Sequence, residues 1–368
     1  MRVIFILPGR GGGGGAHSVV QEAIGLRRHG VDVAIAGSAD TATDFRMTYP
    51  ELAHHGVPNP TFSDTERLAR IISGYDFAVA TTAPSAVQLA SALAGLGESE
   101  RPRGAYYVQD YEPLFFNPGT PEWNAARASY TAIPGSLLFA KTEWLRSIVG
   151  ENHNVTVQRV RPSLDHSIYF AGLPQPSPVV RISAMLRPAT PRRAPRRTAR
   201  ILERINARWG ASVSLSAFGC EADNLRDSGV ALSPQVRLSG PLPRRQVAAL
   251  LRESDLFLDL SDYQAFGRTA LESMACGCIP MVPALGGASE FARDGVNALV
   301  VDTRSDEEIM AAVERFIETS ASGRTALRSE AILTALEYSI EKAAHSLLQA
   351  FLNHAGPGLA GTSARAVD

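Results

Sequence analysis

The stretch "SDYQAFGRTALESMACGCIP", residues 261–280, places a polar Gln264 and an acidic Glu272 on either side of a Phe-Gly-Arg-Thr run. The apolar run "DLFLDLS" that leads into it predicts a buried strand, and the pattern from Arg268 to Cys276 predicts a helix. Gln264 then lies in the connecting loop, while Glu272 lies about one turn into the helix. The two side chains do not share one helix face but bracket the helix N-terminus.

That helix start predicts an anion site. The first N–H groups of a helix have no partner within it, and the helix dipole favours negative charge there. A phosphate held by the N–H groups of Gly267, Arg268 and Thr269 would leave the Glu272 carboxylate to accept two hydrogen bonds from a ribose diol. In the alternative interpretation, Glu272 is a structural first-turn acid, which the dipole favours by about 0.3–1 kcal/mol.

Short apolar runs alternate with helical patterns along almost the whole chain, which indicates βαβ units and buried parallel sheets. In the first half, strands are expected at 3–7, 31–36, 76–82, 105–109, 136–141 and 155–160, with helices at about 17–29, 64–74, 84–95, 121–131 and 142–150. In the second half, strands are expected at 179–185, 211–219, 235–240, 255–261, 278–284 and 297–302, with helices at about 192–209, 244–253, 268–276, 305–319, 323–335 and 338–354.

The predicted fold class is α/β, with two doubly wound Rossmann-like domains facing each other across a ligand cleft. We expect an N-terminal domain at 1–160, a linker with four prolines at 161–178 and a C-terminal domain at 179–336. A helix at 337–354 is expected to cross back to the first domain. The tail 355–368 has no periodicity and is predicted to be disordered.

Composition narrows the class of protein. Hydrophobic residues make up 45% of the chain and charged residues 20%, and the net charge of −1 gives no support to binding of nucleic acid. The opening "MRVIFILPGR" is too short an apolar run for a signal peptide or membrane span. The three cysteines cannot pair fully, and Cys276 and Cys278 lack the spacing of a redox or zinc pair. We therefore expect a cytoplasmic protein with reduced thiols, with weak peripheral membrane contact left open.

Five glycines, 11–15, stand between the first strand and the first helix, where backbone N–H groups could approach an anion. Gly9, Gly11 and Gly14 formally fit the dinucleotide pattern G-x-G-x-x-G, but the acid expected at the end of the second strand is missing. The alternative is a flexible connection. His17, just after the glycines, is either a surface or cap residue or a hydrogen-bonding partner of a substrate hydroxyl.

Polar side chains also follow two other predicted strands. Asp110 and Glu112 come after the strand at 105–109, where they could orient sugar hydroxyls or act as a base, or could form a solvated turn. Arg187 and Arg192 lie nearest the end of the strand at 179–185, and arginine forks bind phosphate oxygens well. We see no Asp-x-Asp motif or histidine cluster that would hold a metal ion.

The segment at 261–280 resembles the donor-binding motif S-x-x-E-G-F-G-x-x-x-L-E-A-M-A-x-G-x-P of GT-B-fold glycosyltransferases, in particular the retaining family 4. The matching residues are Ser261, Phe266, Gly267, Leu271, Glu272, Met274, Ala275, Gly277 and Pro280, while Gln264 replaces the first glutamate. Downstream, "ALGGASEFARDGVNALVVD" resembles the family's G-G-x-x-E…D-G-x-N-G-x-L-V, and "LDHSIY" at 164–169 resembles its linker motif. "YYVQDYEP" and "LRPATPRR" are similar to the rhamnosyltransferase-like branch, which uses dTDP-rhamnose to build surface polysaccharides.

This resemblance implies roles for the candidate residues. Glu272 would hold the donor ribose and Gln264 the sugar hydroxyls, while Arg187, Arg192 and the N–H groups at Gly267, Arg268 and Thr269 would hold the diphosphate. Gly14 and Gly15 would close on the donor, and Gly240 and Phe266 would complete the donor-binding set. His17, Asp110 and Glu112 would lie nearer the acceptor.

The implied function is transfer of a hexose or deoxyhexose from a nucleoside diphosphate sugar to an acceptor hydroxyl, with retention and without a metal ion or other cofactor. The departure at Gln264 matters, because an amide cannot offset positive charge that develops at the sugar C1 atom. Three alternatives stay open: a GT-B-fold nucleotide-sugar epimerase, a non-catalytic nucleotide-sugar-binding subunit and an NAD-dependent enzyme.

Overall fold

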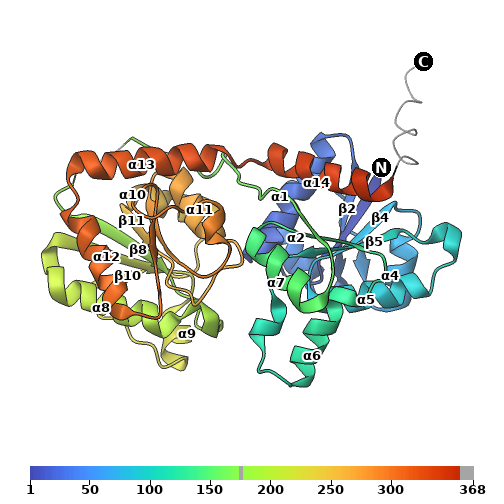
Figure 1. The fold of residues 1–368 in the computed structure, drawn as a ribbon, viewed down its shortest axis with the longest axis horizontal. Helices are drawn as coiled ribbons and strands as arrows, with labels where there is room; N and C mark the ends of the chain where they lie inside the picture. The colour runs from blue at the N-terminus through green and yellow to red at the C-terminus, as the bar shows by residue number, and fades with distance from the viewer. Residues whose placement is uncertain (174–176, 357–368) are drawn as a thin grey trace, which may run out of the picture. The chain divides into compact units, whose positions relative to one another are not determined.

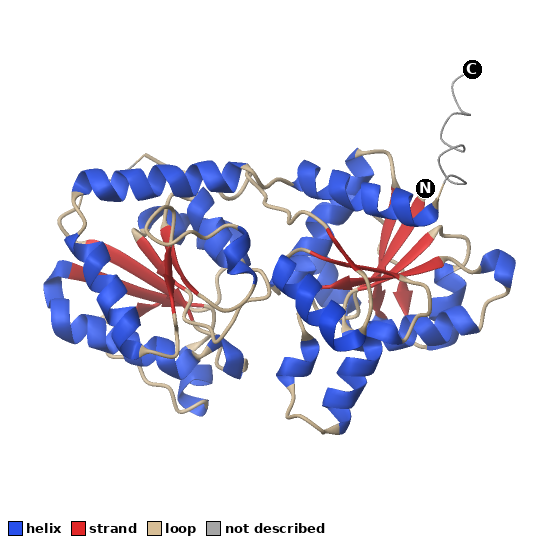
Figure 2. Ribbon diagram, in the orientation of Figure 1, coloured by secondary structure: helices blue, strands red, loops and turns tan. Residues whose placement is uncertain are grey.

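The computed structural model describes residues 1–173 and 177–356. The contacts within the chain divide it into two units, which are treated separately below. One unit comprises Met1–Ser163 with the segment from Tyr338 on, and the other comprises Leu164–Glu337. Each unit is built on one sheet of parallel strands with helices on both faces (Figures 1 and 2).

The first unit contains a seven-stranded sheet in the order β3-β2-β1-β4-β5-β6-β7. Its strands are β1 (Arg2–Ile6), β2 (Asp32–Ser38), β3 (Thr61–Phe62), β4 (Phe77–Ala80), β5 (Arg103–Val108), β6 (Leu137–Ala140) and β7 (Val157–Arg159). Its α-helices are α1 (Gly14–Arg28), α2 (Ala42–Thr48), α3 (Glu51–His54), α4 (Thr65–Ile72), α5 (Ala83–Ala94), α6 (Pro121–Ala128), α7 (Glu143–His153) and α14 (Ile340–Ala355).

The second unit contains a six-stranded sheet in the order β10-β9-β8-β11-β12-β13. Its strands are β8 (Val180–Met185), β9 (Val213–Phe218), β10 (Val236–Leu238), β11 (Leu256–Leu258), β12 (Ile279–Pro283) and β13 (Leu299–Val301). Its α-helices are α8 (Pro195–Trp209), α9 (Ala222–Asp227), α10 (Arg244–Glu253), α11 (Arg268–Ala275), α12 (Asp306–Glu318) and α13 (Ala321–Leu336). In both sheets every paired strand runs parallel to its neighbours, so the carboxyl ends of the strands share one edge.

The last helix, α14, packs against α1 of the first unit. A Cβ atom at Gly25 would lie 2.7 Å from the Cβ of Ala344, so glycine on α1 permits this close approach. The ring of Phe351 of α14 packs at a tilt of 38° against Phe77 of β4, with 4.8 Å between the ring centroids. These contacts bury the apolar face of α14 in the core of the first unit.

Most of the predicted linker, 161–178, belongs to the second unit, which begins at Leu164. The Arg252 guanidinium lies 4.6 Å from the centre of the Phe170 ring, and Arg328 donates to the Gly172 carbonyl over 2.8 Å. Arg328 also donates to Gly277 at the end of α11 over 2.6 Å. Of the predicted tail 355–368, Ala355 ends α14 and residues from 357 on lie outside the described residues.

The structure differs from the expected elements in a few places. The first helix begins at Gly14 rather than at about 17, so His17 lies within the first turn and does not begin the helix. β11 ends at Leu258, although a strand is expected as far as Ser261. The short elements β3, α2, α3 and α9 are absent from the sequence expectation, because runs of two to seven residues carry little periodicity.

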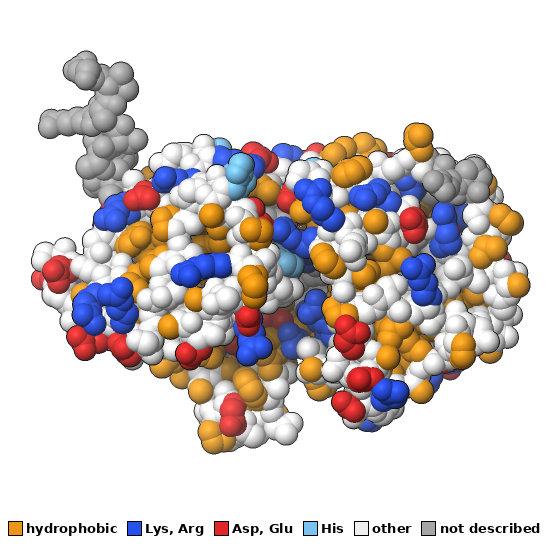
Figure 3. All heavy atoms as spheres, turned by 180° about the vertical axis from the view of Figure 1, so that it is seen from behind, with side chains coloured by type: hydrophobic (Ala, Val, Ile, Leu, Met, Phe, Trp, Pro, Cys, Tyr) orange, Lys and Arg blue, Asp and Glu red, His pale blue; other side chains and the backbone are white. Residues whose placement is uncertain are grey.

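Acidic and basic side chains are interspersed over the face of the molecule in Figure 3. Such a mixed surface agrees with the net charge of −1. Across residues 1–173 and 177–356, none of the helices has the length and apolarity to cross a membrane.

Candidate functional site

Helix α11 starts on a backbone that favours glycine. Gly267 precedes it with φ of +89°, and none of the described side chains caps the helix start. A Cβ atom at Gly267 would lie 3.3 Å from Phe291, whose ring also meets Phe266 edge-on at 5.5 Å between centroids. The Phe266 ring is therefore buried in packing, so any contact of Phe266 with a ligand would come from its backbone. The first N–H groups of α11 follow, at the carboxyl edge of the sheet.

Glu272 is a buried carboxyl group, 5% exposed, on the first turns of α11. Burial raises its pKa to about 7, although Arg268, a hydrogen bond with Tyr169 and the charge of Arg244 act in the opposite direction. The Arg268 guanidinium is 3.9 Å from the Glu272 carboxylate, and both side chains are largely buried. A carboxyl that titrates near neutral pH beside a helix start is typical of a functional site rather than of a solvated helix face.

Arginines gather after β8, at the same edge of the sheet. Arg187 follows the strand, and Arg192 and Arg193 lie in the next turn. Desolvation lowers the pKa of Arg187, with the neighbouring positive charges of Arg193 and Arg192 acting in the same direction, while Glu272 and Asp259 oppose the shift. The Arg192 carbonyl accepts a 2.9 Å hydrogen bond from the backbone of Asp262, which ties this turn to the loop after β11. Several guanidinium groups at one edge of the sheet favour an anionic ligand there.

Gln264 is 8% exposed and is fixed by two hydrogen bonds. Its Nε2 donates to the Asp259 carboxylate over 2.5 Å and to the Ser261 hydroxyl over 3.1 Å. Its backbone forms a bridge with Gly286, whose φ is +109°. A Cβ atom at Gly286 would lie 2.2 Å from the Gln264 carbonyl oxygen, so the close approach of these two loops requires glycine.

Gly240 lies at the same edge, beyond β10. Its φ is +70°, and its carbonyl accepts a 2.8 Å hydrogen bond from Gly219, which follows β9. A Cβ atom at Gly240 would lie 3.6 Å from the Glu221 carboxylate. Gly240 thus shares the carboxyl edge of the sheet with Arg187, Gln264 and the start of α11.

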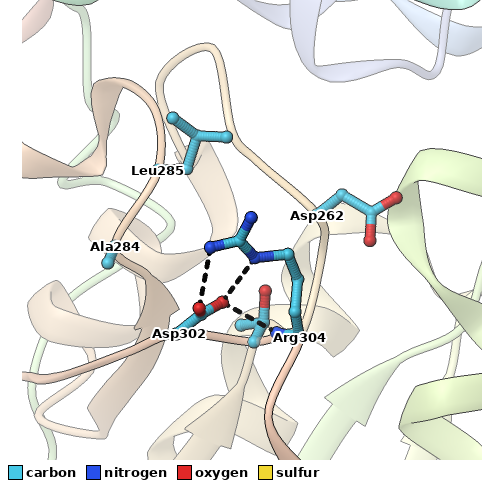
Figure 4. Close-up of a pocket in the computed structure, with 6 residues that line it drawn as sticks. Asp262, Ala284, Leu285, Asp302 and Arg304 are labelled. Carbon is cyan, nitrogen blue, oxygen red and sulfur yellow. Dashed lines mark hydrogen bonds and ion pairs between the residues drawn. The ribbon is translucent and has the colours of Figure 1, made fainter.

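A pocket of about 270 Å³ opens beside this group, beyond β12 and β13. It is lined by Asp262, Ala284, Leu285, Asp302, Thr303 and Arg304. Figure 4 shows Arg304 forked onto Asp302, and this contact lowers the Asp302 pKa to about 2. The Asp262 carboxylate turns away from that pair, and it binds Arg197 over 2.8 Å. The predicted donor residues do not line this pocket, and its charges are matched within the protein.

The first unit presents a different set of polar contacts at the start of α1. The Tyr49 hydroxyl accepts a 3.0 Å hydrogen bond from the Gly12 N–H and lies 2.7 Å from His17 Nδ1. A Cβ atom at Gly15 would lie 3.0 Å from the Gln109 side-chain oxygen. Tyr49 and Gln109 therefore bring the glycine run, His17 and the end of β5 together.

The two predicted acceptor carboxylates have structural partners. Glu112 accepts a 2.8 Å hydrogen bond from the Ala83 N–H at the start of α5, and the Tyr106 hydroxyl is 3.4 Å away. Asp110 accepts a 2.9 Å bond from the N–H of Tyr111. These bonds shape the loop after β5, and an acceptor role for either residue stays a prediction.

Two residues near the site escape the sequence prediction. Tyr169 comes from the "LDHSIY" segment and helps to lower the pKa of Glu272, so the linker motif is the signal that could have predicted its place at the site. Asp259 lies inside the predicted strand 255–261, where an alternating pattern gives no reason to expect it at the site. The described residues do not bring together any group of three or more metal-binding side chains.

Comparison with known proteins agrees with this architecture. Residues 223–334 match the family model described as "Glycosyl transferases group 1". An O-antigen biosynthesis protein, RfbC, from Myxococcus xanthus is 30% identical over 208 residues, which is 56% of this chain and 15% of that protein. A D-inositol 3-phosphate glycosyltransferase from Streptosporangium roseum is 29% identical over 111 residues, 30% of this chain and 25% of that protein. The chain thus spans about a quarter or less of these two curated relatives.

Two solved structures show the same fold over nearly all of the chain. Anabaena Alr3699/HepE in complex with UDP-glucose has a TM-score of 0.77 at 18% identity, and covers 95% of this chain and 98% of its own. Sucrose-phosphate synthase from Thermosynechococcus elongatus has a TM-score of 0.72 at 13% identity, with 95% and 97% covered. The protein has the GT-B glycosyltransferase fold. The residues that match the group 1 glycosyltransferase model lie in its second unit and include Gln264 and Glu272.

Proposed function

We propose that this protein transfers a hexose or deoxyhexose from a nucleoside diphosphate sugar to an acceptor hydroxyl, with retention at the anomeric carbon. The observation that carries the proposal is the convergence of Glu272, Arg187 and the start of α11 at one edge of the second sheet. A buried carboxyl with a pKa of about 7, an arginine with a lowered pKa and a helix start without a capping side chain complement a ribose diol and a diphosphate.

Each part of the donor has a partner in this arrangement. Arg187, Arg192 and the first N–H groups of α11 bind the diphosphate, and Glu272 accepts hydrogen bonds from the ribose hydroxyls. Gln264 faces the sugar. Because the diphosphate gains negative charge as it leaves, fixed positive charge and N–H dipoles stabilise the transition state more than the bound donor.

The reaction breaks the bond between the sugar C1 atom and the diphosphate oxygen, whose electron pair leaves with the diphosphate. The acceptor oxygen forms the new bond to C1, and its proton passes to the departing diphosphate. In this scheme the protein supplies no dedicated base and no metal ion. The rate in an assay without added metal should therefore stay unchanged when EDTA is added to remove any metal bound to the protein.

The first unit is the proposed acceptor side, through His17, Asp110 and Glu112. The relative from Myxococcus xanthus is named for O-antigen biosynthesis, which supports a role in polysaccharide assembly. The Anabaena neighbour is bound to UDP-glucose, which makes UDP a donor nucleotide to test first, together with dTDP for a rhamnosyl donor.

A thermal-shift titration with UDP, dTDP, GDP, ADP and NAD tests the nucleotide. A ligand at 100 times its dissociation constant adds about 2.7 kcal/mol of stability. Stabilisation by one nucleoside diphosphate but not by NAD is the expected result. At the same ligand concentration Glu272→Ala should lower that stabilisation to about half or less, while Glu318→Ala, an exposed change on α12, should leave it unchanged. A response to NAD alone, or to none of the five, contradicts the proposal.

Incubation with the matching sugar nucleotide then separates the enzymatic alternatives. Release of nucleoside diphosphate with a new glycoside in a panel of sugar acceptors is the expected outcome. Appearance of the epimeric sugar nucleotide would identify an epimerase, and an unchanged donor in every mixture would favour the non-catalytic subunit.

A further inference from the structure

The second unit buries a carboxylate whose hydrogen-bonding partners are all neutral. Asp259 follows β11 and is 9% exposed. Its Oδ1 accepts from the Ser261 hydroxyl over 2.6 Å and from the Ser261 N–H over 3.3 Å, and its Oδ2 accepts from Gln264 Nε2 over 2.5 Å. Burial of a carboxylate is costly, and neutral partners offset that cost less than a cation would.

This carboxylate determines how the Gln264 amide is oriented. An ionised carboxylate can only accept hydrogen bonds, so the amide must turn its NH₂ group toward Asp259. The carbonyl Oε1 then points away from Asp259, and none of the described side chains donates to it. Gln264 thus presents a hydrogen-bond acceptor whose dipole is aligned by a negative charge behind it.

The charge of Asp259 also reaches the phosphate-binding side of the proposed site. The net pKa of Arg187 is lowered by desolvation, and the negative charges of Asp259 and Glu272 both oppose that shift. The loop after β11, which carries Asp259 and Gln264, is held in place by the loop after β12. The backbone of Gln264 forms a bridge with Gly286, and its carbonyl accepts a hydrogen bond from the Gly287 N–H. Asp259 and Gln264 therefore form a rigid pair that carries one negative charge.

We infer that Asp259 is a positioning residue that supplies, through Gln264, the negative potential on the sugar side of the donor site. The inference rests on the proposed function. It explains how a site with an amide at position 264 can still offset the positive charge that develops at the sugar C1 atom. Asp259 itself does not touch the sugar: its charge polarises the amide, whose Oε1 accepts from a sugar hydroxyl and faces the positive charge that develops at C1. The pair then does what a single carboxylate at position 264 would do.

An exchange of the two side-chain types tests the inference. Asp259→Asn removes the charge but keeps the shape, and should lower the turnover of the sugar nucleotide at least tenfold while nucleoside diphosphate affinity changes less than threefold. Gln264→Glu places two carboxylates within hydrogen-bonding distance, so one proton must be shared and turnover relative to wild type should rise as the pH falls. The double variant D259N/Q264E again holds one charge and one donor, and should recover to within about threefold of wild type.

Asp302→Asn is the matched control, because it removes a carboxylate from the same sheet edge outside the pair. It should leave turnover within twofold of wild type. Thermal unfolding of all variants checks folding, and if D259N fails to fold, the pH response of Q264E decides alone. A double variant no more active than the poorer single variant, an unaffected D259N or a flat relative pH response of Q264E overturns the inference. A wild-type protein that turns over no sugar nucleotide overturns the proposed function and the inference with it, so the two failures are distinguishable.

Discussion

The two units each begin a helix on glycine at the carboxyl edge of a parallel sheet, but the two helix starts differ in their surroundings. Both α1 and α11 lack a capping side chain and an acidic residue in the first turn. Polar side chains of Tyr49, His17 and Gln109 gather at the start of α1, with Lys141 donating to Ser18 farther along that helix. Arg268, Glu272 and Arg187 lie around the start of α11. The helix dipole is common to both, so the neighbouring charges decide which end suits a diphosphate.

The glycines themselves differ between the two regions, and their replacement should give the largest effect. Gly286→Ala places a methyl group 2.2 Å from the Gln264 carbonyl on a backbone that only glycine adopts readily, so the second unit should lose more than about 3 kcal/mol. Gly12→Ala also has positive φ, at +77°, but meets no atom within 4 Å and should cost only about 1–2 kcal/mol. Urea unfolding of the two variants measures both values, and equal losses would show that loop contact at Gly286 is not tight.

The next largest effect is the pH dependence of stability that comes from Glu272, the buried carboxyl group of the second unit. Because the folded-state pKa of Glu272 is raised to about 7 from its usual 4.5, the folded state binds more protons between these values than the unfolded chain. The stability contributed by the protonated form is therefore present at pH 4–5 and lost as the pH rises through about 7. The loss is at most roughly 3.5 kcal/mol, because a tenfold difference in proton affinity between the folded and unfolded states corresponds to about 1.4 kcal/mol.

Glu272→Gln provides the comparison, since glutamine does not titrate. The stability of the wild type relative to Glu272→Gln, measured by urea unfolding at pH 5 and pH 8, should fall between the two pH values. A difference that is independent of pH would mean that Glu272 is ionised throughout and that burial does not govern its pKa.

Part of the fold and part of the candidate site can be predicted from the sequence. The strand and helix alternation is readable because strands buried on both faces are continuous apolar runs, and Gly267 marks the start of α11 through its positive φ. Arg187, Gln264 and Glu272 follow from that alternation, because parallel strands end at one edge. Tyr169 against Glu272 depends on how a distant segment packs, and Asp259 beside Gln264 depends on where β11 ends. The backbone N–H of Ser261 turns back to the Asp259 carboxylate, a local competition that periodicity does not reveal.

The affinity for a nucleoside diphosphate distinguishes the start of α11 from the start of α1 more directly. Glu272→Ala should weaken the affinity for the preferred nucleoside diphosphate at least tenfold, about 1.4 kcal/mol, because the ribose loses its acceptor. His17→Ala, at the start of α1, should leave that affinity within threefold. Isothermal titration calorimetry gives both constants, and an unchanged affinity for Glu272→Ala would remove α11 from the proposed nucleotide site.

The smallest effect is expected at Tyr49, which connects the glycine run to His17 through one hydroxyl. Tyr49→Phe removes that hydroxyl but keeps the ring, so the Gly12 N–H loses its 3.0 Å partner and His17 its 2.7 Å partner. Because Gly12 is exposed and water can replace the lost bond, stability should fall by only about 1 kcal/mol. If the start of α1 orients an acceptor, the same variant should raise the acceptor KM severalfold with nucleotide affinity unchanged. A change in nucleotide affinity instead would mean that the start of α1 also takes part in donor binding, and the division between the two helix starts would fail.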